Sequence, residues 1–332
     1  MSYLSRPRRG FVLGKFMPPH AGHVYLANFA ARFASELTIV VGTLAREPIP
    51  GALRFQWMRR LFPHARVLHL EDENPQDPSE HPDFWNIWRE SLQRVVGRPV
   101  DYVFASEPYG ARLAAELSAT FVPLDLGRTA LSVSGTAIRA DPLRHFDLLP
   151  APVRPYFARR VSIFGPESTG KSTLARNLAG HFRTVHVPEL ARTWLTQRGG
   201  EVAPEDMPII ARGQAAAEDA LAEQANRVWF TDTDPLATCV WSETLFGAVA
   251  PEVRSVADAR TYDLTLLLDV DVPWVPDLVR YLPDDRRGFF LRCQAALETA
   301  GRRTQVLRGS FEARIQAAIE AVEAMLTMPR VP

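Results

Sequence analysis

The chain has 332 residues, of which 46% are hydrophobic and 23% are charged. Its 38 Lys and Arg residues balance its 38 Asp and Glu residues, so the formal net charge is zero and no general nucleic-acid or membrane surface is expected. One domain usually takes about 100 to 200 residues, so this length predicts two domains, each with its own core.

Two further features narrow the class of protein. Cys239 and Cys293 have no metal-ligand or CxxC spacing, so we expect reduced, buried thiols. The basic start MSYLSRPRRG is followed by too few apolar residues for a signal peptide, and no apolar run reaches transmembrane length. We therefore expect a cytoplasmic protein that is not inserted in a membrane and does not bind nucleic acid.

Strand-like and helix-like segments alternate through the first half of the chain, which predicts a parallel sheet covered by helices in a domain at 9–148. Residues 71–83, rich in acids and prolines, indicate a surface connection rather than a metal site. The strand-like runs are 10–14, 36–42, 65–70, 101–107 and 119–126, with helical patterns between them.

A proline-rich stretch, 141–156, contains the start of a predicted linker at 149–159, and the alternation then begins again. We expect a second α/β domain at 160–328, so the chain is predicted to hold two doubly wound parallel sheets. Its strand-like runs are 161–165, 184–189, 227–234, 263–271 and 304–309, and its helical patterns include 171–182, 191–197, 208–226 and 311–326.

The stretch GKFMPPHAGH, Gly14 to His23, follows the first apolar run and leads into a helical pattern that begins near Gly22. Free backbone N–H groups at a helix start attract anions, and Lys15, His20 and His23 add an ammonium and two imidazoles. A His pair at this spacing also suits a metal, but no third ligand is near, so Zn²⁺ is not expected.

Ser134, Thr136 and Arg139 form the motif SGTAIR, in which Ser134 is a good helix N-cap. Such a motif alone is usually only a cap. Together with GKFMPPHAGH it predicts nucleotidyl transfer, because a phosphate that attacks the α-phosphate of ATP needs positioning and charge stabilisation but no general base.

The second domain opens with GPESTGKS, from Gly165 to Ser172, which matches the P-loop pattern and has a strand before it and a helix after it. Its N–H groups are expected to cradle phosphates, with Lys171 on the β and γ oxygens and Ser172 on Mg²⁺. Lys15 and Lys171 are the only lysines of the chain. Chance placement explains this poorly, because each lies in a separate phosphate-binding motif.

Three carboxylates, Glu189, Asp232 and Asp234, follow strand-like runs of the second domain, where open α/β sheets bind ligands. Any single one of them has the alternative of a surface acid. Three arginines in a polar, proline-containing stretch suggest a mobile lid over the transferred phosphoryl group, with a charged surface loop as the alternative. They are Arg280, Arg286 and Arg287.

GxFxPxHxGH followed by SGTxxR resembles the HxGH nucleotidyltransferase superfamily, with its Rossmann-like fold, which includes nicotinamide mononucleotide adenylyltransferases, pantetheine-phosphate adenylyltransferases and FAD synthetases. With FWNIWRESL, VFASEPYG and the P-loop domain, the chain is similar to the bifunctional NadR family from about Arg9 to Leu326. There, an adenylyltransferase domain is fused to a ribosylnicotinamide kinase domain. Some members begin with a helix-turn-helix repressor domain; here the motif starts at Phe11, and DNA-binding repression is not expected.

The resemblance implies NAD salvage in two steps: ATP phosphorylates nicotinamide riboside, and a second ATP adenylylates the mononucleotide to NAD and pyrophosphate. It also suggests coupling to a riboside transporter, and a homo-oligomer is compatible with the sequence. The kinase base is left open between Glu189 and Asp232. The alternatives are another adenylyltransferase paired with another small-molecule kinase, and a nucleotide sensor without turnover.

The resemblance also implies roles for individual residues. The expected catalytic residues are Lys15, His20, His23, Arg139, Lys171, Glu189 and Asp232. ATP contacts are expected from Gly14, Phe16, Gly22, Ser134, Thr136, Gly165, Glu167, Ser168, Thr169, Gly170, Ser172, Thr173, Arg280, Arg286 and Arg287. Mg²⁺ contacts are expected from Ser172 and Asp232, and substrate contacts from Trp85, Trp88, Ser106, Tyr109 and Asp234, where the alternative for the tryptophans is core packing.

Overall fold

A computed structural model describes residues 8–329 of the chain. The first residues of the basic segment MSYLSRPRRG lie outside this range. The described residues form two compact units that divide between Val153 and Arg154. The predicted domain limits, 9–148 and 160–328, and the linker stay predictions, although a helix of one turn lies within the linker range. The elements near the division are η1 (Phe146–Leu148), η2 (Ala151–Val153) and α6 (Arg154–Phe157).

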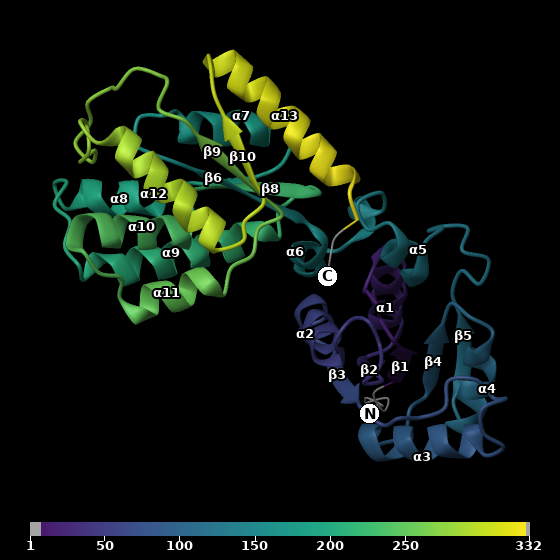
Figure 1. The fold of residues 1–332 in the computed structure, drawn as a ribbon. Coiled ribbons are helices and arrows are strands. Elements are labelled where there is room, and N and C mark those ends of the chain that lie inside the picture. The colour runs from purple at the N-terminus through teal and green to yellow at the C-terminus, as the bar shows by residue number, and fades with distance from the viewer. Residues whose placement is uncertain (1–7, 330–332) are drawn as a thin grey trace, which may run out of the picture. The chain divides into compact units, whose positions relative to one another are not determined.

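The first unit contains a parallel five-stranded sheet in the order β3-β2-β1-β4-β5, drawn in purple to blue in Figure 1. The side chains of its middle strand β1 alternate between the two faces of the sheet. Val12 packs under α1 and α2, whereas Phe11 packs under α3 and α4. The strands are β1 (Arg9–Gly14), β2 (Glu36–Gly42), β3 (Arg66–Leu70), β4 (Tyr102–Ala105) and β5 (Thr120–Pro123). The helices are α1 (Ala21–Phe33), α2 (Gly51–Leu61), α3 (Phe84–Val96), α4 (Tyr109–Glu116) and α5 (Gly135–Ala140).

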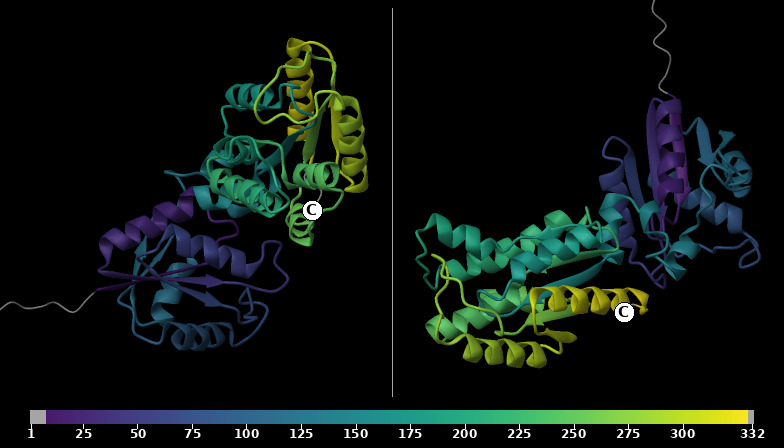
Figure 2. Two further views of the ribbon diagram at one scale, coloured as in Figure 1. Left: turned by 90° about the vertical axis from the view of Figure 1, so that its left-hand side faces the viewer. Right: turned by 90° about the horizontal axis from the view of Figure 1, so that it is seen from above.

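The second unit repeats this design with the parallel order β10-β9-β6-β8-β7. Helices α7 and α13 cover one face and α9 to α12 the other, which Figures 1 and 2 show in teal to yellow. The strands are β6 (Arg159–Phe164), β7 (His186–Val187), β8 (Val228–Asp232), β9 (Leu264–Leu268) and β10 (Thr304–Leu307). The helices are α7 (Lys171–His181), α8 (Leu190–Gln197), α9 (Asp206–Ala222), α10 (Pro235–Phe246), α11 (Pro251–Asp258), α12 (Arg286–Thr299) and α13 (Phe311–Thr327).

Helix α10 illustrates how local sequence fixes the elements. Asp234 caps it by accepting a hydrogen bond from the Leu236 N–H at 2.8 Å, and Pro235, which has no N–H, occupies the first turn. The helix ends at Gly247, whose φ of 69° is left-handed and favours glycine. Such start and stop signals mark the ends of a helix in the sequence. The two parallel sheets with helices on both faces confirm the prediction of two doubly wound domains.

Two local expectations are wrong. The run 184–189 forms a strand of only two residues, because Pro188 lacks the N–H that a longer ladder would need. Arg286 and Arg287 belong to the first turn of α12 rather than to the loop before it. Both cysteines are free and buried, as predicted. Within residues 8–329, no helix is both long and apolar enough to cross a membrane.

Candidate functional sites

The first unit contains a cavity of about 840 Å³ at the carboxyl ends of its strands. Because β1 ends at Gly14, the predicted phosphate loop begins at this edge, and the starts of α1, α4 and α5 meet it there. The sequence-predicted residues that line the cavity are Gly14, Lys15, Phe16, His20, Gly22, His23, Trp85, Trp88, Ser106, Tyr109, Ser134, Thr136 and Arg139.

Contacts with the backbone of Met17 join the two nucleotidyltransferase motifs. Arg139 donates a hydrogen bond of 2.5 Å from Nη1 to the Met17 carbonyl. A Cβ on Gly135 would lie 2.6 Å from the same carbonyl oxygen, so only glycine allows this approach. Ser134 caps α5 as predicted, accepting from the Ala137 N–H at 3.1 Å. The SGTAIR segment therefore packs directly on the phosphate loop.

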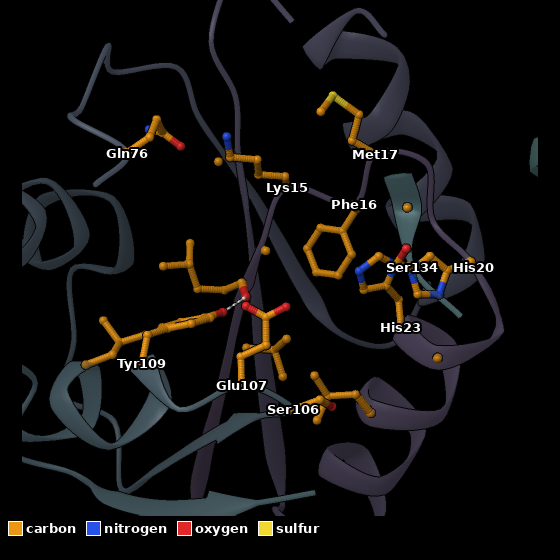
Figure 3. Close-up of a pocket in the computed structure, with 18 of the residues that line it drawn as sticks. Lys15, Phe16, Met17, His20, His23, Gln76, Ser106, Glu107, Tyr109 and Ser134 are labelled. Carbon is orange, nitrogen blue, oxygen red and sulfur yellow. Dashed lines mark hydrogen bonds between the residues drawn. The ribbon is translucent and has the colours of Figure 1, made fainter. Parts of the chain in front are cut away.

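Figure 3 shows the imidazoles of His20 and His23 side by side next to Ser134. Their ring centroids are 3.7 Å apart. Burial and the nearby Arg128 lower the pKa of His20 to about 4, and burial, His20 and Arg128 lower that of His23. Both rings are therefore neutral near pH 7. Both residues line the cavity, and among the described residues neither buried Nδ1 has a hydrogen-bond partner.

Lys15 contacts two buried charged side chains, those of Glu47 and Arg54. Its ammonium lies 3.1 Å from Glu47, and its carbonyl accepts a 2.7 Å hydrogen bond from Arg54. Arg54 is fully buried and also pairs with Glu47. Sequence analysis missed Glu47 and Arg54, although a charged residue between the apolar residues of a helix was a usable signal.

The tryptophans pack in the core as the alternative predicted, and their contact with a substrate stays a prediction. Trp85 and Trp88 pack on the apolar cluster under α3 and also line the cavity. The Trp88 indole donates to the Pro75 carbonyl at 2.8 Å, so the ring is held by the loop 71–83. That loop contributes Gln76 to the cavity wall and is therefore more than a connection.

The second unit contains a smaller cavity of about 370 Å³, also at the carboxyl edge of its sheet. It is lined by most of the residues predicted for this site. They are Glu167, Ser168, Thr169, Gly170, Lys171, Ser172, Thr173, Glu189 and Arg280.

The P-loop connects β6 to α7 and depends on two glycines. Gly165 and Gly170 have φ angles of 130° and 90°, which other residues rarely adopt. A Cβ on Gly165 would lie 2.8 Å from the Leu268 carbonyl, so this glycine serves packing against β9 rather than the cavity. The Lys171 ammonium donates to the Pro166 carbonyl at 2.7 Å. This contact crosses the loop that is expected to bind the phosphates.

Two carboxylates lie close to Lys171. Burial raises the pKa of Asp232, against the lowering effects of Lys171 and the Ser172 hydroxyl. Burial and the charge of Asp232 raise the pKa of Glu189 to about 7. Asp232 Oδ1 is buried and has no hydrogen-bond partner among the described residues. A free carboxylate oxygen beside a hydroxyl fits the oxygen ligands that Mg²⁺ takes.

Three predicted residues of this domain point elsewhere. Asp234 is buried, caps α10 and lies 3.8 Å from Arg302, outside the cavity lining. Arg287 pairs with Asp269 at 2.9 Å and also lies outside the lining. Arg286 donates to the Ser168 carbonyl at 3.2 Å and so contacts the backbone of the P-loop.

The segment after β9 docks on the P-loop as a lid would. Glu167 accepts hydrogen bonds from the N–H groups of Tyr281 at 2.9 Å and Leu282 at 3.3 Å. The Ser168 hydroxyl accepts from the Val275 N–H at 2.8 Å and lies 3.4 Å from Arg280. Every one of these contacts would have to change if the lid opened.

Several residues of this cavity were missed by sequence analysis. The rings of Trp241 and Tyr281 lie edge to face with their centroids 6.4 Å apart, and both line the cavity with Arg192 and Gln214. The only signal for Trp241 is an aromatic residue in an apolar helix, which is more often core.

These sites define a class: a two-domain α/β protein that joins a nucleotidyltransferase-like domain to a P-loop kinase-like domain. A family model described as an AAA domain matches residues 160–314. The trifunctional NAD biosynthesis/regulator protein NadR of Escherichia coli (strain K12) is 31% identical over 96% of this chain and 83% of its own length. NadR of Salmonella typhimurium is 30% identical over 97% of this chain and 85% of its own length. The chain belongs to the NadR family.

Solved structures agree in fold. A NadR crystal structure in complex with NAD and AMP-PNP superimposes with a TM-score of 0.78 at 23% identity and covers 100% of both chains. A NadR structure in complex with NR gives a TM-score of 0.80 at 22% identity over 98% of both chains. The predicted family and fold class are thus confirmed. Membership of this family also confirms the prediction of an enzyme of NAD biosynthesis.

Proposed function

We propose that this chain catalyses two consecutive reactions of NAD biosynthesis. Its second domain transfers the γ-phosphoryl group of ATP to the 5′-hydroxyl of nicotinamide riboside. Its first domain then joins the mononucleotide to AMP from another ATP and releases pyrophosphate. The observation that carries the proposal is the presence, in a NadR family member, of two separate cavities that are each lined by residues of a predicted phosphate-binding loop.

The second site suits phosphoryl transfer to a hydroxyl, which must lose its proton. Glu189 lines the cavity and has a pKa of about 7, so it suits the role of base better than Asp232, which lies outside the lining. Lys171 is available to the β and γ oxygens of ATP. Bound Mg²⁺ would neutralise charge on these phosphates, with Ser172 and Asp232 as its protein ligands.

The same cavity suits a nicotinamide riboside acceptor. The pyridinium ring of the riboside is flat and positively charged. Trp241 and Tyr281 offer aromatic rings to such a cation, and Glu189 adds a carboxylate nearby.

The first site suits adenylyl transfer. The 5′-phosphate of the mononucleotide is already anionic, so its oxygen can attack the α-phosphorus of ATP without a base while the bond to the β-phosphate oxygen breaks. Lys15 and Arg139 supply positive charge for the phosphates. His20 and His23, held neutral, supply N–H donors without the desolvation cost of two buried cations. Trp85 and Trp88 are available to a nicotinamide ring.

A product assay tests the proposal. Purified protein, MgATP and nicotinamide riboside are incubated, and the mononucleotide and NAD are followed separately by chromatography. The expected result is mononucleotide first and NAD second. Mononucleotide without NAD would overturn the role of the first domain. NAD formed only from added mononucleotide would overturn the role of the second domain.

Coupling to a riboside transporter and a homo-oligomer stay predictions.

A further inference from the structure

The strand order of the second sheet sets the kinase cavity apart from the turn after β10, although the segment after β9 also lines the cavity through Arg280 and Tyr281. The P-loop follows the middle strand β6, with β8 and β7 on one side and β9 and β10 on the other. Residues that follow β7 and β8, namely Glu189, Arg192 and Trp241, line the cavity. The turn after β10 contributes none of the lining residues.

If this cavity takes the phosphoryl acceptor, as proposed above, the position of the ADP moiety follows. The attacking and leaving oxygens lie roughly in line on opposite sides of the transferred phosphoryl group. With the acceptor over β7 and β8, the leaving ADP extends toward the ends of β9 and β10. Its base can then reach the turn that connects β10 to α13.

An exposed aromatic residue stands there. Phe311, the first residue of α13, is 49% exposed. A Cβ built on Gly170 of the P-loop would lie 2.7 Å from Cε1 of Phe311, so the ring edge rests directly on the phosphate loop. Phe311 is not part of the apolar core that α13 covers. Core packing therefore does not account for it.

Buried polar contacts hold this ring in place relative to the P-loop. Arg314, one turn further along α13, is buried and donates to the carbonyls of Thr169 at 2.8 Å and Asp269 at 3.0 Å. Ser310 caps the same helix by accepting from the Ala313 N–H at 3.2 Å. The start of α13 is thereby tied to the loop that carries the phosphates and to the end of β9.

We propose that Phe311 is the stacking wall for the adenine base of the ATP that donates the phosphoryl group. A purine offers a flat π face to an aromatic ring, and such stacking is sequence-tolerant. The donor nucleotide is thus bound at both ends, by the P-loop at its phosphates and by Phe311 at its base. This inference rests on the proposed kinase function of the second domain.

Substitutions at Phe311 test the inference in the riboside phosphorylation assay, with mononucleotide and NAD counted together. Phe311→Ala is expected to raise the KM for ATP about tenfold, the change that corresponds to about 1.4 kcal/mol, while the KM for the riboside stays within about twofold. Phe311→Tyr keeps the ring and should keep the KM for ATP. Leu291→Ala, a similarly exposed apolar residue of the same domain at 51%, is the matched control.

Two measurements separate stacking from a structural effect. Tripolyphosphate has no base, so its inhibition constant should be equal for Phe311→Ala and wild type. In Phe311→Trp, ATP should change the tryptophan fluorescence relative to wild type, and Lys171→Ala should remove that difference. This readout needs no acceptor, so it still tests Phe311 if the riboside is not the substrate. An unchanged KM for ATP in a normally folded Phe311→Ala protein would overturn the inference. So would a rise in the inhibition constant of tripolyphosphate as large as the rise in the KM for ATP.

Discussion

The ammonium of Lys15 lies 3.1 Å from the carboxylate of Glu47, a side chain that is itself almost completely buried. Burial raises the pKa of Glu47, but hydrogen bonds from the Leu44 N–H, Lys15 and Arg54 outweigh this and lower it. A buried carboxylate thus holds Lys15, the lysine proposed to bind phosphate, in the lining of the first cavity. If Lys15 leaves this partner for a nucleotide phosphate, as proposed, Arg54 remains to neutralise Glu47.

Arg54→Met should therefore damage both stability and adenylyl transfer. It leaves Glu47 without its buried partner and removes the donor to the Lys15 carbonyl, so we expect a loss of about 3 to 5 kcal/mol in the free energy of unfolding. Adenylyl transfer should fall at least about tenfold, since the loop is misplaced. Urea denaturation and NAD formation from added mononucleotide measure the two effects. Arg59→Met, on the exposed face of the same helix, is the control and should change neither.

The two phosphate loops should be separable by single substitutions. Lys171→Ala is expected to lower riboside phosphorylation at least about a hundredfold and leave adenylyl transfer intact, because it removes the ammonium that stabilises the negative charge of the transferring phosphoryl group. His23→Ala should have the reverse effect. Each activity is measured with its own substrate, riboside or mononucleotide. If each substitution abolished both activities in folded protein, the two-site model would be rejected.

Asp232→Asn should weaken the proposed Mg²⁺ site. The amide keeps the shape of the side chain but loses the charge of the buried carboxylate, so phosphorylation should need a higher Mg²⁺ concentration and its maximal rate should drop. A titration of Mg²⁺ at fixed ATP measures this. Adenylyl transfer by the same protein is the internal control, because Asp232 belongs to the second domain. An unchanged Mg²⁺ dependence would remove Asp232 from the site.

Glu218 should make the second domain less stable as the pH rises. It is buried and accepts from the Tyr262 hydroxyl at 2.8 Å and 2.9 Å. Burial and the charge of Asp234 raise its pKa from 4.5 to about 8. The folded state therefore binds more protons than the unfolded state between these values, and the free energy of unfolding falls with rising pH by up to about 1.4 kcal/mol per pH unit.

Denaturation of wild type and Glu218→Gln between pH 5 and pH 8 measures this effect, over a range that lies inside the window set by the two pKa values. Glu218→Gln should remove the contribution of Glu218 to the slope, so its free energy of unfolding should gain on that of wild type toward the alkaline end. Asp219→Asn, an exposed neighbour on α9, should keep the wild-type slope. Parallel pH profiles for wild type and Glu218→Gln would refute the raised pKa.

The sequence by itself determined the features that depend on neighbours along the chain. The alternation of strands and helices, the cap at Ser134, the P-loop glycines and the His20 and His23 pair all follow from local periodicity and turn chemistry. Parallel βα order then brings strand ends to one edge. For this reason every residue predicted for the first site lines one cavity.

Only the tertiary structure decided which side chains at that edge face a cavity. Neither Asp232 nor Asp234 lines the cavity, and Asp234 turns inward because it caps α10 and meets Arg302. Arg287 is drawn to Asp269, and Glu47 to Arg54, by contacts between distant segments. Whether a buried charge has a partner depends on such long-range packing, and no periodicity along the chain encodes it.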